Sequence, residues 1–235
     1  MTLSVIPVGG LPEVRPGDDL AGLILDQATL LEGDVVVVTQ KVVSKAEGRL
    51  EALSRDDPRA RAALVERESR RVLRRRGDLV VSETHQGFVC ANAGVDLSNV
   101  EEGHASLLPR DADRSARRIR ESLRARTGLG RDLGLGVIVS DTFGRPWRRG
   151  STDVAIGCAG VAAVVDLRGQ LDALGRTLEV TEVCVADELA SAAELVMGKA
   201  AGIAAGIVRG VDPAWLRESS VSEEIVRPPN EDLFR

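Results

Sequence analysis

The chain has 235 residues, of which 43% are apolar, so it can bury a full core as one large domain or two closely associated lobes. Its net charge of −5 and its aromatic content of 2% provide neither a basic surface nor base-stacking side chains, which argues against nucleic-acid binding. The start MTLSVIPVGG lacks the features of a signal peptide, and the apolar stretch 200–208 is too short to span a bilayer. We therefore expect a cytoplasmic protein that does not act at a membrane.

The first half of the chain contains apolar runs typical of strands and two segments with helical signals. In chain order the pattern predicts a strand at 2–8, a helix at 20–31, a strand at 35–40, a helix from 58 to about 76, and strands at 78–84 and 87–95. Asp18 or Asp19 is placed to cap the first helix, and Asp57 followed by Pro58 suits the start of the second. The four valines at 35–38 leave no polar face, so we expect that strand to be buried on both sides.

The second half continues the alternation of helices and strands. The pattern predicts a helix at 111–127, strands at 135–141, 153–165 and 178–185, a helix at 186–198 and a last strand at 202–208, followed by an irregular tail. Leu189, Ala193 and Val196 share one face of the last helix and predict its buried side. Without internal repeats or a long linker, the chain is expected to form one mixed α and β unit over residues 1–235.

Several common catalytic motifs are absent from this sequence. The Gly198-Lys199 pair is not a Walker A loop, because Ala193 and Ala200 stand where that motif needs glycine and a hydroxyl residue. His85 and His104 lack the spacing of a metal site, and we expect both at the surface. Three cysteines show no CxxC spacing and are interpreted as buried small apolar residues: Cys90, Cys158 and Cys184.

Polar clusters remain at the expected ends of strands, where binding loops usually lie. Asp141 and Thr142 follow an apolar strand and offer the oxygen ligands that Mg²⁺ or Mn²⁺ prefers. Asp96, Ser98 and Asn99 form a second oxygen-rich group, although a simple Asx turn is an alternative interpretation.

Lysine is rare in this chain, with only Lys41, Lys45 and Lys199 among 31 basic residues. An ammonium group suits phosphate oxygens, so Lys45 after the valine strand and Gly198-Lys199 after the last helix are candidates for nucleotide binding. Chance placement on solvated helix ends is the alternative. Together, the acidic positions and the lysines suggest chemistry on a metal–nucleotide complex.

Five segments, in this order, resemble the coenzyme F(420):L-glutamate ligases, also called F(420)-0 γ-glutamyl ligases. They are GGLPEVRPGDDL, VVVVTQKVVSKAEGRL, CANAGVDLSNV, SDTFGRPWRRGSTDVAIGCAG and VADELASAAELVMGKA, and they span nearly the whole chain. The resemblance implies GTP-dependent γ-linkage of L-glutamate to the deazaflavin precursor F(420)-0 or its dehydro form, with Mg²⁺ or Mn²⁺ and often K⁺. It also implies a two-lobed α and β fold particular to this family, in an intertwined homodimer.

The resemblance carries site residues over by position. The family's GTP contacts match Leu11, Pro12, Glu13, Val14, Gln40, Lys45 and Asn99, and its metal ligands match Asp96, Asp141 and Thr142. Four positions depart from common family residues, which affects expected local contacts: Gln40, Ser140, Arg149 and Ser151.

The chemistry that the resemblance implies is activation of a carboxylate by phosphoryl transfer from GTP, followed by attack of the glutamate amine on the acyl phosphate. Lys45 and Arg145, or Arg148, would then stabilise oxyanions, and Gly144 and Pro146 would shape a loop. Phe143 and Trp147 either line an apolar wall for the deazaflavin or fix that loop to the core. Two alternatives stay open at this point: a non-catalytic nucleotide-binding protein, and a ligase for another carboxylate acceptor.

Overall fold

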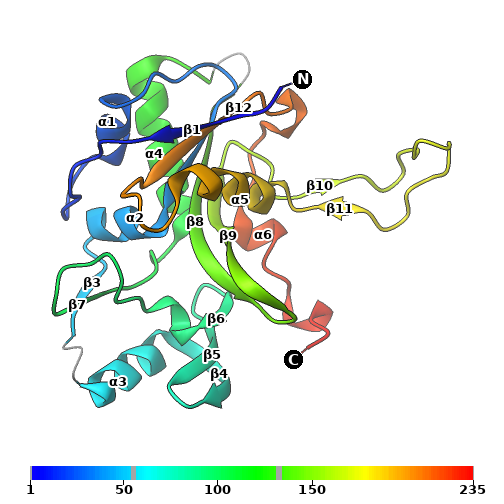
Figure 1. Cartoon of the computed structure of the whole chain (residues 1–235). Helices are drawn as coiled ribbons and strands as arrows, with labels where there is room; N and C mark the ends of the chain where they lie inside the picture. The colour runs from blue at the N-terminus through cyan, green and yellow to red at the C-terminus, as the bar shows by residue number, and fades with distance from the viewer. Residues whose placement is uncertain (1, 54–56, 131–133, 235) are drawn as a thin grey trace.

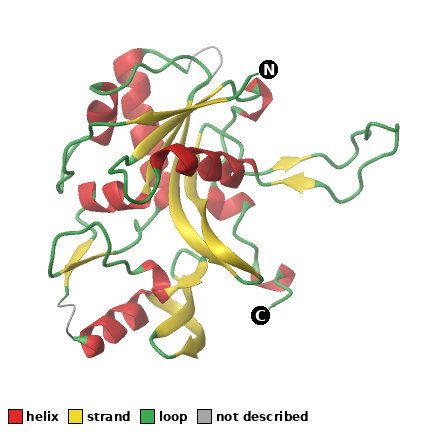
Figure 2. Ribbon diagram, in the orientation of Figure 1, coloured by secondary structure: helices red, strands yellow, loops and turns green. Residues whose placement is uncertain are grey.

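The computed structural model describes residues 2–53, 57–130 and 134–234, and its centre is a five-stranded sheet (Figures 1 and 2). The strands lie in the order β1 (Ser4–Val8), β12 (Ala205–Arg209), β2 (Val35–Thr39), β8 (Gly136–Arg145) and β9 (Arg148–Ala159). β2 and β8 are parallel, and the other neighbouring strands are antiparallel. The expected mixed α and β architecture is confirmed.

Helices cover both faces of this sheet. α1 (Leu20–Leu25) and α4 (Ala112–Thr127) pack on one face, and α5 (Val185–Met197) and α6 (Val221–Glu224) pack on the other. The valines of β2 alternate between the two cores, with Val36 and Val38 in the first and Val35 and Val37 in the second. β2 is therefore buried on both faces, as its sequence predicts.

A smaller α and β region lies beside the main sheet and has an apolar core of its own. It contains α3 (Pro58–Glu68), the three-stranded sheet of β4 (Ser69–Arg76), β5 (Leu79–Thr84) and β6 (Val89–Ala91), and the pair β3 (Leu50–Ala52) and β7 (His104–Ser106). The Asp57 carboxylate accepts hydrogen bonds from the backbone N–H groups of Arg59 and Ala60 and so caps α3. The predicted N-terminus of this helix is confirmed.

The prediction that this helix continues to about Arg76 is wrong. α3 ends at Glu68, and the arginine-rich segment that follows is strand β4. Gly77 and Asp78 form a two-residue connection to β5, with Gly77 at φ +56° and Arg76 paired with Leu79. A Gly-Asp pair between two strands is a recognised hairpin signal, and here it outweighs the helical propensity of arginine.

The segment 140–150 is a β-hairpin and not a loop that follows a strand. β8 continues to Arg145, β9 begins at Arg148, and Pro146 and Trp147 make the turn between them. Asp141 and Thr142 therefore lie within a strand, where pairing with β9 fixes their backbone.

Other elements differ from the sequence prediction mainly in length. The expected helix 20–31 shortens to α1, and the expected strands 153–165 and 178–185 contribute β9, β10 (Val165–Asp166) and β11 (Glu182–Val183). β10 and β11 form the base of a long arm that projects from the body of the protein (Figure 1). The helix α2 (Gln40–Ala46), directly after β2, has no counterpart in the prediction. Short 3₁₀ turns complete the description at Asn92–Gly94, Pro213–Trp215 and Pro229–Glu231.

The cysteines and histidines largely take the predicted positions. Cys90 and Cys158 are buried and Cys184 is partly buried, and burial raises the pKa of each thiol to about 12. His85 is exposed as expected, whereas His104 in β7 is half-buried. Among the described helices, none combines the length and apolarity needed to cross a membrane.

Candidate functional site

The candidate site lies where the parallel strands β2 and β8 reach their carboxyl ends. Thr39, the last residue of β2, pairs with Ser140 of β8, and its backbone N–H donates to Ala204 O just before β12 (2.9 Å). From this level β2 leads into α2 and β8 continues into the hairpin. Ligands of open α/β sheets commonly bind at this edge, because strand ends leave loops and helix starts that project polar groups into one space.

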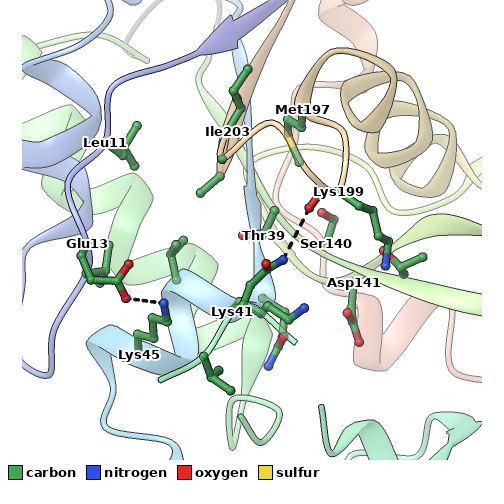
Figure 3. Close-up of a pocket in the computed structure, with 18 of the residues that line it drawn as sticks. Leu11, Glu13, Thr39, Lys41, Lys45, Ser140, Asp141, Met197, Lys199 and Ile203 are labelled. Carbon is green, nitrogen blue, oxygen red and sulfur yellow. Dashed lines mark hydrogen bonds and ion pairs between the residues drawn. The ribbon is translucent and has the colours of Figure 1, made fainter. Parts of the chain in front are cut away.

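A cavity of about 820 Å³ opens at this edge, within the range of small-molecule sites (Figure 3). Most of the residues singled out from the sequence line it: Leu11, Pro12, Glu13, Val14, Gln40, Lys45, Asn99, Asp141, Thr142, Gly198 and Lys199. These residues come from five separated segments of the chain. The fold therefore brings together the nucleotide-binding candidates and two of the three metal-ligand candidates.

Lys45 forms an ion pair with Glu13 at one side of the cavity, and Asp141 and Lys199 lie at the other side in Figure 3. The Lys45 side chain is only 10% exposed, whereas Glu13 is 73% exposed. α2 places Lys41 and Lys45 four residues apart, hence on one helix face, and both line the cavity. The two ends of the cavity therefore offer different charged groups to a ligand.

Lys41 is a site residue to which the sequence analysis assigned no role. Its Nζ lies 2.8 Å from Asp96 Oδ2 and donates to Ser98 Oγ (2.6 Å). Burial opposes ionisation of Asp96, but hydrogen bonds from Lys41 and Ser98 outweigh it and lower the pKa of this carboxyl. Asp96 is therefore held ionised by a neighbouring cation.

Asp141 is in the opposite electrostatic situation. Burial raises its pKa from 3.8 to about 7, and the negative charges of Asp96 and Asp153 act in the same direction. A carboxylate whose ionisation is disfavoured in this way gains most from an added cation.

Asp153 is a second site residue that the sequence analysis missed. It is 4% exposed, lines the cavity, and stands opposite Thr142 in the β8–β9 register. Its carboxylate accepts hydrogen bonds from Thr142 Oγ1 and from Ser140 Oγ (3.0 Å). With its hydrogen directed at Asp153, the Thr142 hydroxyl keeps its lone pairs available to the cavity.

The donor set fits a hard divalent cation in an open site. Asp96, Asp141 and Thr142 supply carboxylate and hydroxyl oxygens, the ligands that Mg²⁺ and Mn²⁺ prefer. Within the described part of the chain, no three His, Cys, Asp or Glu side chains form a group that could hold a metal ion by themselves. Mg²⁺ commonly keeps several waters and is bound by one or two carboxylates together with substrate phosphates.

Gly198 ends α5 in a conformation that few other residues adopt. Its φ of +57° and ψ of 156° belong to a region essentially restricted to glycine, and it turns the chain from the helix into the cavity wall. Asn99, also at positive φ (+52°), approaches this wall, with its Nδ2 3.5 Å from Lys199 O. This contact between Asn99 and Lys199 links the 198–199 segment to the 96–99 segment across the cavity.

Three expected site residues are placed differently from the rest. Arg145 lines neither this cavity nor the one beside it, and its guanidinium donates to Arg149 O (2.8 Å) near the exposed hairpin turn. Gln40 lines the cavity, but its amide nitrogen contacts Ser44 Oγ, Ser106 Oγ and Leu107 O at 3.0–3.1 Å. Asp96 lines an adjacent second cavity, which shares Asp141, Thr142 and Lys199 with the first.

The two aromatic residues of the hairpin have separate environments. Phe143 makes an edge-to-face contact with Phe88, at a ring-centroid distance of 6.2 Å, and so helps to fix the hairpin against its neighbours. Trp147 is 82% exposed at the turn and contacts Phe234 of the C-terminal segment.

Comparison with known proteins shows which family the chain belongs to. Residues 10–210 match the family model described as F420-0:Gamma-glutamyl ligase. The coenzyme F420:L-glutamate ligase of Methanothermobacter thermautotrophicus is 45% identical, with the whole of both chains covered. Those of Methanopyrus kandleri and Archaeoglobus fulgidus are each 44% identical over all of this chain and 98% and 97% of their own lengths. The matched residues include all the segments that build the cavity, and the chain belongs to the F420-0:γ-glutamyl ligase family.

Proposed function

We propose that this protein is a GTP-dependent ligase that joins L-glutamate by γ-linkage to coenzyme F(420)-0 or its dehydro form. The family supports the ligase activity. The observation that carries the GTP dependence is the single cavity that combines the 11–14 loop, the two lysines of α2 and the Asp141–Thr142 pair.

GTP would occupy the 820 Å³ cavity, with its phosphates toward Asp141 and Thr142. Lys45 then contacts the nucleotide from the opposite side, after exchange of its Glu13 partner for the ligand. Lys199 is the lysine at the Asp141 side of the cavity, and we assign it, in place of Arg145, to the transferred phosphate. The compact charge of an ammonium suits that task.

Asp96, Asp141 and Thr142 would hold Mg²⁺ or Mn²⁺. When bound, the cation neutralises charge on the nucleotide phosphates, the main requirement of phosphoryl transfer. Lys41 keeps Asp96 ionised, and Asp153 orients the Thr142 hydroxyl. The K⁺ requirement that the resemblance implies is tested by replacing K⁺ with Na⁺ in the assay.

The reaction requires activation of a carboxylate, because an unactivated carboxylate is a poor acyl donor. A carboxylate oxygen of the acceptor bonds to the γ-phosphorus of GTP, the bond to the β-phosphate oxygen breaks, and GDP leaves. The glutamate amine then attacks the acyl carbon, phosphate departs, and the amine nitrogen loses a proton. The protein contributes positioning and charge neutralisation and forms no covalent bond.

We further propose that the protein is an intertwined, two-lobed homodimer. The β10–β11 arm supports this, because it projects from the body with only a two-residue strand pair at its base. Leu171, Leu174 and Val180 on this arm are 67–85% exposed. Apolar side chains on an extended arm gain stability by packing against a second copy. Light scattering at low micromolar concentration is expected to give the dimer mass; a monomer mass contradicts the proposal.

The deciding experiment is incubation with GTP, Mn²⁺, L-glutamate and F(420)-0, followed by mass spectrometry of the deazaflavin product. We expect a mass increase of one or more glutamyl residues, dependent on GTP. Asp141→Asn keeps the side-chain shape but removes the charge that a hard cation needs, and is expected to lose most of this activity, about 100-fold or more. Absence of product from the parent protein, or full activity of Asp141→Asn, would overturn the proposal.

A further inference from the structure

A second cavity of about 570 Å³ lies beside the first, on the other side of Asp141 and Thr142. Its walls come from β8, from Arg61 of α3, from the segment 90–98 of the smaller region and from Lys199, which follows α5. The volume falls within the 300–1,000 Å³ that drug-sized ligands usually occupy. Asp141, Thr142 and Lys199 belong to both cavities, so these three residues form the boundary between them.

The charges of the second cavity favour an anionic occupant. Asp96 is already paired with a cation of the protein, because Lys41 Nζ lies 2.8 Å from its Oδ2. Within the described residues, neither Arg61 nor Lys199 forms an ion pair with a carboxylate of the protein. Guanidinium binds a carboxylate or phosphate with two parallel hydrogen bonds, so Arg61 is suited to hold such a group.

The second cavity also has an apolar wall that suits a ring system. Phe143 lines it and is held by its edge-to-face contact with Phe88, so the position of this ring is fixed before a ligand binds. A fixed aromatic ring provides contact area at little entropic cost. L-Glutamate has no aromatic or extended apolar part to use such a wall.

The geometry of phosphoryl transfer relates the two cavities. The attacking oxygen and the leaving oxygen lie roughly in line, on opposite sides of the transferred phosphorus. With the nucleotide in the first cavity and its phosphates at Asp141 and Thr142, the attacking carboxylate has to approach from beyond these residues. The second cavity is the space on that side.

We propose that the second cavity is the acceptor subsite, which binds the carboxylate-bearing deazaflavin with Arg61 on its anionic part and Phe143 against its apolar part. This inference rests on the proposed function, because it takes the nucleotide to occupy the first cavity. The smaller region of the fold then takes part in acceptor binding, because α3 contributes Arg61 and β6 contributes Ala91 to this subsite.

The test uses Arg61→Gln with Arg59→Gln as its matched control. Both arginines belong to α3, but Arg59 is exposed and does not line the cavity. Loss of a charge-assisted contact is expected to raise the KM for F(420)-0 at least about tenfold, with the KM values for GTP and L-glutamate within about twofold of the parent. Arg59→Gln is expected to leave all three KM values unchanged.

A binding measurement without turnover completes the test. Calorimetric titration of F(420)-0 into the metal-free protein is expected to show weaker binding to Arg61→Gln than to Arg59→Gln. Ala91→Trp, at an exposed position of the cavity wall, fills the subsite without touching the core and is expected to abolish F(420)-0 binding while GTP binding persists.

The outcomes separate the two proposals. A parent protein that makes no glutamylated product contradicts the proposed function. An active parent whose Arg61→Gln and Ala91→Trp variants bind F(420)-0 normally contradicts the subsite alone. A change confined to the KM for L-glutamate would assign this cavity to glutamate and also overturns the inference.

Discussion

Carboxylates with contrasting partners lie at the two ends of the β2–β8 strand pair. At the amino end, Asp34 is fully buried, and its two oxygens accept hydrogen bonds from Arg209 Nε and Nη2, each at 2.8 Å. At the carboxyl end, burial raises the pKa of Asp141 and the negative charge of Asp153 acts in the same direction, and no described basic side chain forms an ion pair with either carboxylate. A carboxylate that pairs with a cation of the protein stabilises the fold. A carboxylate without such a partner can bind a cation that arrives with a ligand.

The largest expected effect is at the amino end. Arg209→Ala leaves Asp34 buried without its cation and is expected to destabilise the protein by about 3–5 kcal/mol, measured by urea unfolding. The control is Arg126→Ala, because the Arg126–Asp19 pair is about half exposed and its loss is expected to cost under about 1 kcal/mol. Equal losses of unfolding free energy in the two variants would show that the buried Arg209–Asp34 pair contributes no more stability than a surface pair.

Lys45→Ala tests the nucleotide side of the carboxyl end. Loss of one charge-assisted contact is expected to weaken GTP binding by about 1.5–3 kcal/mol, which corresponds to roughly 10- to 150-fold in Kd. The fold should be unaffected, because the Glu13 partner of Lys45 is exposed and remains solvated. Arg118→Ala removes an exposed cation of α4 and serves as the control; unchanged GTP affinity in Lys45→Ala would identify Lys45 as an ordinary lysine.

Asp153→Asn tests whether the second buried carboxylate positions a metal ligand. The two hydroxyls donate to different oxygens of Asp153, Ser140 to Oδ2 and Thr142 to Oδ1. In asparagine one of these two atoms becomes an NH2 donor, so one hydroxyl loses its acceptor and has to turn. Mn²⁺ affinity in the presence of GTP, measured by electron paramagnetic resonance, is expected to fall about tenfold. Ser140→Ala removes only one of the two donors and is expected to have a smaller effect; identical affinities in parent and Asp153→Asn would exclude the positioning role.

The last prediction concerns stability without metal. The pKa of Asp141 is raised in the folded protein from 3.8 to about 7, so the folded state favours the neutral carboxyl. The cost of this carboxylate to stability therefore appears as the pH rises from about 4 and is complete above about 7. Asp141→Asn is expected to melt higher than the parent at pH 8 in the presence of EDTA, with the difference vanishing at pH 4. If Asp141→Asn melts at a lower temperature than the parent at pH 8, the ionised Asp141 carboxylate does not destabilise the metal-free protein.

The sequence predicted elements whose signal is local. The four valines at 35–38 predict a doubly buried strand, and Asp57 stands at the helix start that it was expected to cap. The β4 strand was missed because arginine also suits helices, and only pairing with β5 through the Gly77-Asp78 turn decides the structure. That pairing is a tertiary contact rather than a local preference.

The candidate site was predictable to the extent that family motifs mark it. Asp141 and Thr142 were identified, but Asp153 was not, because its role depends on the register that places it opposite Thr142. Arg145 looked suitable by charge alone, and the hairpin turn carries it away from both cavities. Register and turn geometry determine which polar residues share a space, and residue type alone does not give the register.

The valines of β2 have a consequence for how the chain finds its alignment during folding. Because Val35, Val36, Val37 and Val38 are identical, sliding this strand by one position against its neighbours would still present valine to both cores. Such a slip would nevertheless separate Asp34 from Arg209 at one end and carry the lysines of α2 out of the cavity at the other. Burial of the four valines stabilises the strand but does not specify its register. The polar residues at the two ends of the strand specify the register.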